Sequence, residues 1–477
     1  MNASLFQTLP DSCVWVNCTS SNLAAWQQLP LVAMFVNGCS VWCLERARTV
    51  LAWQRQNPGC IQVVLVHVPR FDYDRDPDSV IELFRAEGID SPILLDRNWS
   101  LWHHFRLTAW PTVVVFDTHG QENHRLVGYG SRESIVQCFA ALGARQHSEL
   151  RPDALRQASR QKHSLLLYPR AVAVTSAHLY IADTGHHRIL ECTHEGRVVR
   201  SFGLGTPGRS DGDREEATFC RPCGLAVDRG VVYVADTGNH AIRRIFLMNG
   251  NVDTLCGNGS SGPLCEGQLS SPSSVSLETP LGLAVSENML YFVTAGDNRL
   301  WCYDLDTRTI TRCAGNGHLD DRDGFARFAA FAQPVALTGR QQMLYVCDAL
   351  SSSIRLFQTR EEHVQSLIGG ELGLWEFGKR DGPRATAQLQ YPQGIAHDAQ
   401  SPYLWIADTG NQCLRTLRLG GGELTTVDLP RPLQAPTGLA VSNGMVWIVE
   451  TAAHGILRYD IGAQTLHSVE LVDPYSV

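Results

Sequence analysis

The chain has 477 residues, of which 44% are hydrophobic and 18% charged, so it has globular composition and enough length for more than one domain. Its net charge of −8 argues against binding to a nucleic-acid backbone, which requires a basic surface. The N-terminus lacks the pattern of a signal peptide, and every apolar run falls short of the roughly 18 residues of a membrane-spanning helix. Fifteen irregularly spaced cysteines are typical of reduced core thiols, and we expect a cytoplasmic protein.

Predicted strands and helices alternate through the first 145 residues. Strands are expected at 29–38, 60–69, 91–96, 111–117 and 125–130, with helices at 40–56, 78–88, 100–105 and 132–143. A βαβ opening followed by a ββα ending resembles the thioredoxin fold, so we predict an α/β thioredoxin-like domain at 1–145 and a linker at 146–164. In that fold a cis proline precedes the third core strand beside the redox cysteines, and Pro111 occupies this position.

Six similar strand pairs follow, each containing an aromatic residue, at intervals of 42 to 60 residues. The aromatic residues are Tyr180, Tyr233, Tyr291, Tyr345, Trp405 and Trp447. Regular short strands at this period predict an all-β propeller, here with six blades over 165–477. Because a closed ring has no exposed sheet edges, we expect the stretch 164–169 to pair with the last blade near 465–471.

Acidic residues end a strand just before a turn in four of these pairs, at Asp183, Asp236, Asp348 and Asp408. A carboxylate in this position accepts hydrogen bonds from turn backbone N–H groups. We therefore interpret these residues as turn braces rather than as metal ligands or catalytic groups. We expect no metal and no cofactor.

The repeats resemble the NHL repeat, most closely at 222–242 and 392–414. The first domain adds "VHVPRFDYDRD" at 66–76 and "SLWHHFRLTAWPTVVV" at 100–115. Together they resemble the family of NHL repeat-containing protein 2 and its bacterial relatives, which joins a thioredoxin-like domain to an NHL-type propeller. The animal members carry a further C-terminal β-rich domain, which we expect this chain to lack.

The resemblance also implies a cysteine motif, C-C-x-x-C, at the start of the helix at 40–56. Cys39 and Cys43 match its outer cysteines, whereas Ser40 replaces the middle one, which is the attacking cysteine in thioredoxins. We expect Ser40 to cap the helix with its hydroxyl. A Cys39–Cys43 disulfide requires Cys39 to lie outside the helix, and the helix N-terminus favours a thiolate there. Arg46 is a candidate for adding positive charge near the thiolate of Cys39.

Two other clusters invite a chemical interpretation. Cys220 and Cys223 form a C-x-x-C, but the repeat places them before a strand, where no helix N-terminus stabilises a thiolate. His186 and His187 are adjacent on an extended segment, so their side chains point to opposite faces. We interpret all four as structural.

Three functions stay open from the sequence. The first is thiol–disulfide redox or peroxide sensing by Cys39 and Cys43, with Pro111 beside them. The second is a non-enzymatic binding or scaffold module with a degenerate thioredoxin-like domain. The third is another enzyme with its site in the propeller mouth. In each case we expect the propeller face to bind an unidentified protein or small molecule. We expect no binding to nucleic acid or to a membrane.

Overall fold

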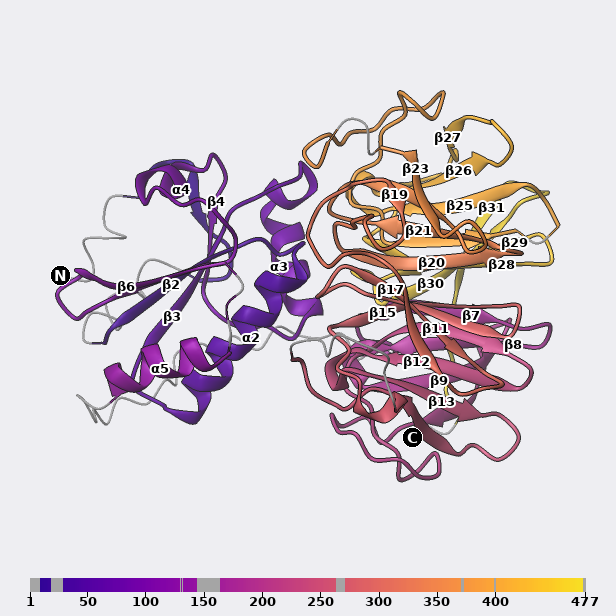
Figure 1. The fold of residues 1–477 in the computed structure, drawn as a ribbon, viewed down its shortest axis with the longest axis horizontal. Coiled ribbons are helices and arrows are strands. Elements are labelled where there is room, and N and C mark those ends of the chain that lie inside the picture. Colours follow the sequence, from indigo (N-terminus) through magenta and orange to yellow (C-terminus); the bar gives the residue numbers. More distant parts are fainter. Residues whose placement is uncertain are drawn as a thin grey trace. The chain divides into compact units, whose positions relative to one another are not determined.

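The computed structural model describes residues 9–18, 29–128, 130, 132–143, 164–262, 271–369, 373–398 and 400–474. The chain divides into two compact units, Met1–Lys162 and His163–Val477 (Figure 1). The predicted linker at 146–164 lies outside the described residues except for its last residue. Among the helices that the structure describes, none is long and apolar enough to cross a membrane.

The first unit is a six-stranded mixed sheet with helices, in the strand order β1-β4-β3-β2-β5-β6 (Figure 1). The central strands β2, β3 and β4 run parallel, and β1, β5 and β6 are added antiparallel. Every residue of β2 is buried, as expected for a parallel strand covered on both faces. The strands are β1 (Cys13–Trp15), β2 (Leu31–Val36), β3 (Gln62–His67), β4 (Ile93–Asp96), β5 (Thr112–Phe116) and β6 (Glu122–Val127). The helices are α2 (Val41–Gln56), α3 (Pro77–Ala86), α4 (Ser100–His104) and α5 (Arg132–Gly143), with a short 3-10 turn η2 (Tyr73–Arg75).

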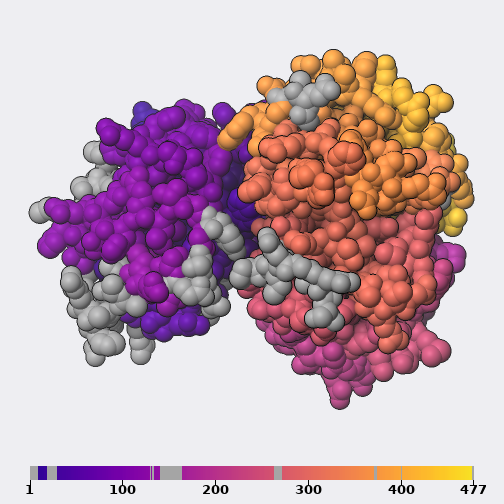
Figure 2. All heavy atoms as spheres, viewed as in Figure 1, coloured from indigo at the N-terminus to yellow at the C-terminus, as the bar shows by residue number. Residues whose placement is uncertain are grey.

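The second unit is a β-propeller with six blades in its described residues, which confirms the predicted architecture and blade number. Each blade is an antiparallel sheet of four consecutive strands, and blade 4 gains a fifth, β19 (Gly324–Phe325). Apolar side chains pack between neighbouring blades, and Figure 2 shows one face of the molecule with all heavy atoms drawn. Their strands are β7 (Ala171–Val174), β8 (His178–Asp183), β9 (Arg188–Thr193) and β10 (Val198–Phe202) in blade 1; β11 (Pro222–Asp228), β12 (Val231–Asp236), β13 (Ala241–Phe246) and β14 (Val252–Cys256) in blade 2; β15 (Pro280–Ser286), β16 (Met289–Thr294), β17 (Arg299–Asp304) and β18 (Ile310–Ala314) in blade 3; β20 (Pro334–Arg340), β21 (Met343–Asp348), β22 (Ser353–Gln358) and β23 (His363–Ile368) in blade 4; β24 (Gly394–His397), β25 (Tyr403–Asp408), β26 (Cys413–Arg418) and β27 (Leu424–Thr426) in blade 5; and β28 (Pro436–Ser442), β29 (Met445–Glu450), β30 (Gly455–Asp460) and β31 (Thr465–Val469) in blade 6.

The ring closes between blades 6 and 1, but not through the strand that the sequence predicted. Residues 164–169 form no strand; the backbone N–H of Leu167 donates to Asp183 at 2.7 Å instead. Closure comes from the Thr451 hydroxyl, which donates to the carbonyl of Pro169 at 2.7 Å, and from Val472, which bridges to the segment before β10. The predicted pairing of 164–169 with 465–471 was therefore wrong, because the hydrogen bonds of this stretch go to turn residues of blade 1 (Asp183, Gly185) and of blade 6 (Thr451, His454) and not to a strand.

Candidate functional site

The cysteine motif occupies the turn between β2 and α2. The helix begins at Val41 with Ser40 at the N-cap, so Cys39 lies outside the helix and Cys43 in its first turn. The turn is held by Asn37, whose side-chain oxygen accepts from the backbone N–H of Cys39 at 2.9 Å. Its carbonyl accepts from the N–H of Ser40 at 3.1 Å. This is the position of Cys39 that a disulfide with Cys43 requires.

Ser40 does not act as the predicted side-chain cap, because its hydroxyl makes no hydrogen bond to the N–H groups of the first turn. The hydroxyl interacts with the thiol of Cys43 instead. Cys39 and Cys43 are both reduced and have 0% exposure, whereas Ser40 is partly exposed. The most exposed position of the motif therefore carries a hydroxyl, and both cysteines are buried.

Burial dominates the chemistry of Cys43. Loss of solvent raises the pKa of its thiol to about 11, although interactions with the Asn37 backbone and the Ser40 side chain act in the opposite direction. Cys43 is therefore a protonated thiol at neutral pH, and it can act as a nucleophile only after losing that proton.

A buried arginine lies near Cys39, on the loop that follows β3. Arg70 is 9% exposed, and its guanidinium lies 5.5 Å from the ring centre of Phe71. Burial lowers the pKa of Arg70 to about 10, and charge interactions with Cys39 and Asp74 oppose this effect. Arg46, the arginine considered from the sequence, donates to the carbonyls of Gly128 and Gly130 instead. Arg70, rather than Arg46, is therefore the arginine whose charge interacts with Cys39.

The loop that carries Arg70 is fastened to the cysteine turn by a buried polar network. Asn37 donates its side-chain amide to Asp74 at 2.6 Å. His67 accepts from the N–H of Gly38 through Nδ1 at 3.2 Å, so Nε2 carries the proton and lies 3.0 Å from the Asp74 carbonyl. Burial lowers the pKa of His67, which keeps its ring neutral. The network fixes Arg70 and Cys39 in one rigid loop pair.

Sequence reasoning assigned no role to Arg70, His67 or Asp74. The signal was present, because all three belong to the stretch 66–76 that carried the family resemblance. Their contact with residues 37–39 is a tertiary contact that strand and helix patterns do not encode.

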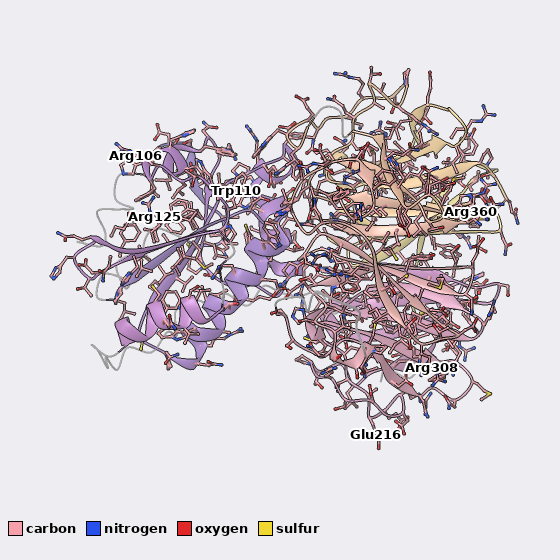
Figure 3. All side chains as sticks on the ribbon, viewed as in Figure 1. Arg106, Trp110, Arg125, Glu216, Arg308 and Arg360 are labelled. Carbon is pink, nitrogen blue, oxygen red and sulfur yellow. The ribbon has the colours of Figure 1, made fainter. Side chains whose placement is uncertain are left out.

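The Trp110–Pro111 peptide bond is cis, as predicted. Pro111 is buried, and the ring of Trp110, labelled in Figure 3, lies 4.9 Å from that of Trp102 and 5.1 Å from that of Trp99. Trp99 donates its indole N–H to the carbonyl of Pro69, directly before Arg70. The predicted contact of Pro111 with Cys43 or Ser40 stays a prediction.

The aspartates at the propeller turns brace the structure. In blade 5, Asp408 accepts from the N–H of Gln390 at 2.8 Å and pairs with the fully buried Arg415 at 2.6 Å. Arg415 also pairs with Asp381, which lies on the loop between blades 4 and 5, at 2.6 Å. Asp381 in turn accepts from Thr426 on the outermost strand. The same arrangement recurs in two other blades, as Asp236–Arg243–Asp211 and Asp348–Arg355–Asp323.

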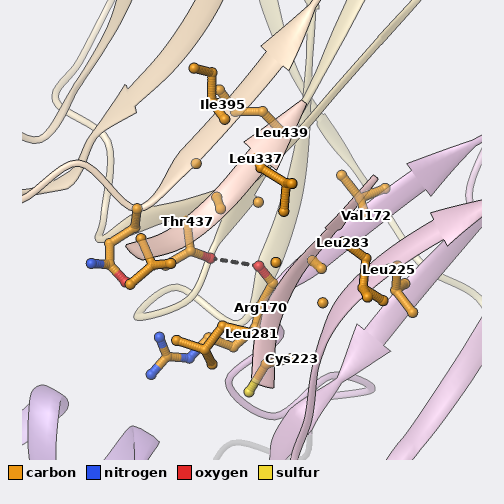
Figure 4. A pocket seen from close by; sticks show the side chains of 18 residues that line it. Arg170, Val172, Cys223, Leu225, Leu281, Leu283, Leu337, Ile395, Thr437 and Leu439 are labelled. Carbon is orange, nitrogen blue, oxygen red and sulfur yellow. Dashed lines mark hydrogen bonds between the residues drawn. The ribbon is translucent and has the colours of Figure 1, made fainter. Parts of the chain in front are cut away.

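The histidine pair and the C-x-x-C of the propeller have structural surroundings. His186 interacts with Asp183 at 2.9 Å, whereas His187 accepts from the backbone N–H of Arg221 at 3.0 Å. Cys223 precedes no helix and lines the central cavity of the propeller (Figure 4). That cavity, crossed by the hydrogen bond from Thr437 to the Arg170 carbonyl, encloses about 100 Å³. Most ligand pockets are larger, roughly 300 to 1,000 Å³.

One segment of the propeller matches a known repeat family. A model of the NHL repeat matches residues 219–245. The chain is 29% identical to NHL repeat-containing protein 2 of Gallus gallus, over 93% of this chain and 68% of that protein. It is 30% identical to Protein SUPPRESSOR OF QUENCHING 1, chloroplastic, of Arabidopsis thaliana, over 83% of this chain and 41% of that protein. A shorter match, to the thiol-disulfide oxidoreductase YkuV of Bacillus subtilis, is 31% identical over 18% of this chain and 58% of that protein. The chain therefore contains an NHL repeat at 219–245, and its second unit is a six-bladed β-propeller similar in sequence to these NHL-repeat proteins.

Proposed function

We propose that the first unit is thioredoxin-like and that Cys39 and Cys43 form a reversible disulfide that senses small oxidants. The observation that carries this proposal is the buried Arg70 beside Cys39, at the N-terminus of α2. A guanidinium and a helix N-terminus both favour the thiolate, which is the reactive form of cysteine. The partial similarity to a protein named as a thiol-disulfide oxidoreductase supports the same chemistry.

The burial of both sulfur atoms favours a small oxidant over a protein disulfide as the reaction partner. A disulfide in another protein does not reach a thiol of 0% exposure, and the exposed position of the motif is Ser40. A peroxide is small enough to enter through a local opening. The Cys39 thiolate attacks one peroxide oxygen and becomes a sulfenic acid, and the other oxygen leaves as hydroxide. Cys43 then attacks the sulfenic sulfur, a disulfide forms, and water leaves.

The direct test follows the state of Cys39 and Cys43 by mass spectrometry of the full chain in graded hydrogen peroxide. Trypsin releases residues 1–46 as one peptide, which also contains Cys13 and Cys18. In a Cys13→Ser/Cys18→Ser background, a loss of two hydrogens from this peptide reports the Cys39–Cys43 disulfide alone. If Cys39 and Cys43 stay reduced until the protein unfolds, the redox function is wrong.

The second candidate is a non-enzymatic module in which the thioredoxin-like unit is degenerate. The observation in its favour is the complete burial of both thiols, with a serine at the accessible position. We propose that the propeller face binds a protein or small-molecule partner under either function. Failure of the peroxide experiment, with an intact fold, selects this second candidate.

A further inference from the structure

A second pair of cysteines lies on neighbouring strands of blade 3. Cys302 is in β17 and Cys313 in β18, and the two strands are antiparallel partners. Cys302 lies opposite Thr311, and a bulge between the pairs Trp301–Arg312 and Leu300–Ala314 leaves Cys313 as the one extra residue of β18. The bulge brings Cys313 closer to Cys302 in the direction of the strands than a regular ladder would.

Both thiols lie on the same face of the blade. Alternate residues of a strand share a face, so Cys302 lies on the side of Leu300 and away from Trp301. Cys313 packs against the cluster that contains Leu300 and Ala314. The two side chains interact with each other and line the same cavity, and the Cys313 thiol also lies 3.9 Å from the carbonyl of Thr311, the residue opposite Cys302.

The contact makes this pair chemically different from single buried cysteines of the propeller. Burial raises the pKa of Cys192 and of Cys413 to about 12. In the pair, the hydrogen bond from Cys313 lowers the pKa of Cys302 and raises that of Cys313. One of the two thiols therefore loses its proton more readily because its partner retains one.

The pair also opens towards solvent. Cys302 is 9% exposed and Cys313 is partly buried, and both line a cavity of about 900 Å³. The same cavity is lined by Arg299, Arg312 and Arg327. A small oxidant reaches this site without the opening that Cys39 and Cys43 require.

We propose that Cys302 and Cys313 are a second redox pair, which closes to a disulfide between β17 and β18 when a peroxide oxidises it. The Cys302 thiolate attacks a peroxide oxygen, the O–O bond breaks, and hydroxide leaves a sulfenic acid behind. The Cys313 sulfur then attacks the Cys302 sulfur, and the expelled hydroxide takes the Cys313 proton to form water. A dithiol reductant reverses the reaction and is itself oxidised to a disulfide. This pair acts independently of Cys39 and Cys43.

The test is peptide mapping of the full chain after peroxide treatment, without reduction. Trypsin cleaves after Arg299, Arg308 and Arg312, so Cys302 and Cys313 fall in separate peptides, 300–308 and 313–322. We expect the two peptides to appear joined by a disulfide, with loss of the two alkylated single peptides. Dithiothreitol should return both single peptides.

Matched variants identify the bond. The joined peptide should be absent from Cys302→Ser and from Cys313→Ser, and present in Cys347→Ser, which removes a fully buried thiol whose partner is the Gly394 carbonyl. If a variant fails to fold, the wild-type digest alone still shows whether Cys302 and Cys313 are joined. Two separate alkylated peptides after peroxide treatment, or joining of either to another cysteine, would overturn the proposal.

Discussion

Replacing Arg70 with methionine should slow the oxidation of Cys39 without unfolding the first unit. Methionine keeps most of the apolar volume but removes the charge that interacts with Cys39. Loss of an opposite charge at close range shifts such an ionisation by about 1 to 3 pH units, so the thiolate population falls about tenfold to a thousandfold. Each unit also raises the intrinsic nucleophilicity of the remaining thiolate by roughly threefold. The net expectation is oxidation slower by about 3- to 50-fold at neutral pH.

The assay measures the rate at which the 1–46 peptide loses two hydrogens in hydrogen peroxide, with alkylation to stop the reaction. Arg70→Lys keeps the charge and should restore most of the rate. Arg46→Met is the matched control, because Arg46 is also a buried arginine of this unit but donates to the carbonyls of Gly128 and Gly130. In this variant trypsin first cleaves after Arg48, so the peptide to follow is 1–48. Equal rates for wild type and Arg70→Met, or equal slowing by Arg46→Met, would refute the role of Arg70.

Three further expectations follow from the same structure. Ser40→Cys places a thiol at the exposed position beside Cys43, so it should raise insulin disulfide reduction above that of wild type; no change would contradict the accessibility explanation. The rate of closure of the Cys39–Cys43 disulfide should rise by up to about tenfold per pH unit between about pH 7 and 9, because Cys43 has a pKa of about 11 and reacts as its thiolate. A rate that does not change with pH would show that the attack of Cys43 is not the slow step. Asp408→Ala leaves Arg415 and the Gln390 N–H without a buried partner and should lower the free energy of unfolding by about 3 to 5 kcal/mol, whereas Asp381→Ala, at a side chain 48% exposed, should cost about 1 kcal/mol or less. Urea unfolding followed by circular dichroism measures both, and equal costs would contradict the braced-turn model.

The six blades could be predicted because each strand pair carries its own signal. An alternating apolar strand, a glycine-containing turn and a second strand form within about 15 residues, and the pattern repeats. The buried arginines carry a readable signal as well. Arg243, Arg355 and Arg415 each follow the turn aspartate by seven residues, a spacing that the aligned repeats contain and that we did not use.

What the sequence could not predict depends on contacts between distant segments. The stretch 164–169 looks like a strand, yet its hydrogen bonds go to turn residues such as Asp183 in blade 1 and His454 in blade 6. Arg70 is 31 residues after Cys39, and only the packing of β3 beside β2 brings the two loops together. The contact between Cys302 and Cys313 depends on a bulge, and bulge positions do not follow from apolar periodicity.

The buried charge at Arg70 favours the redox function over the degenerate module. Burying a guanidinium costs several kcal/mol unless charged or polar partners compensate for the lost water. The charge partners of Arg70 are Asp74 and Cys39. A protonated structural thiol offers an arginine no charge, so the part of this compensation that comes from Cys39 exists only when Cys39 ionises. Under the proposed redox function, ionisation of Cys39 and the buried position of Arg70 stabilise each other, and this mutual stabilisation is the reason to prefer that proposal.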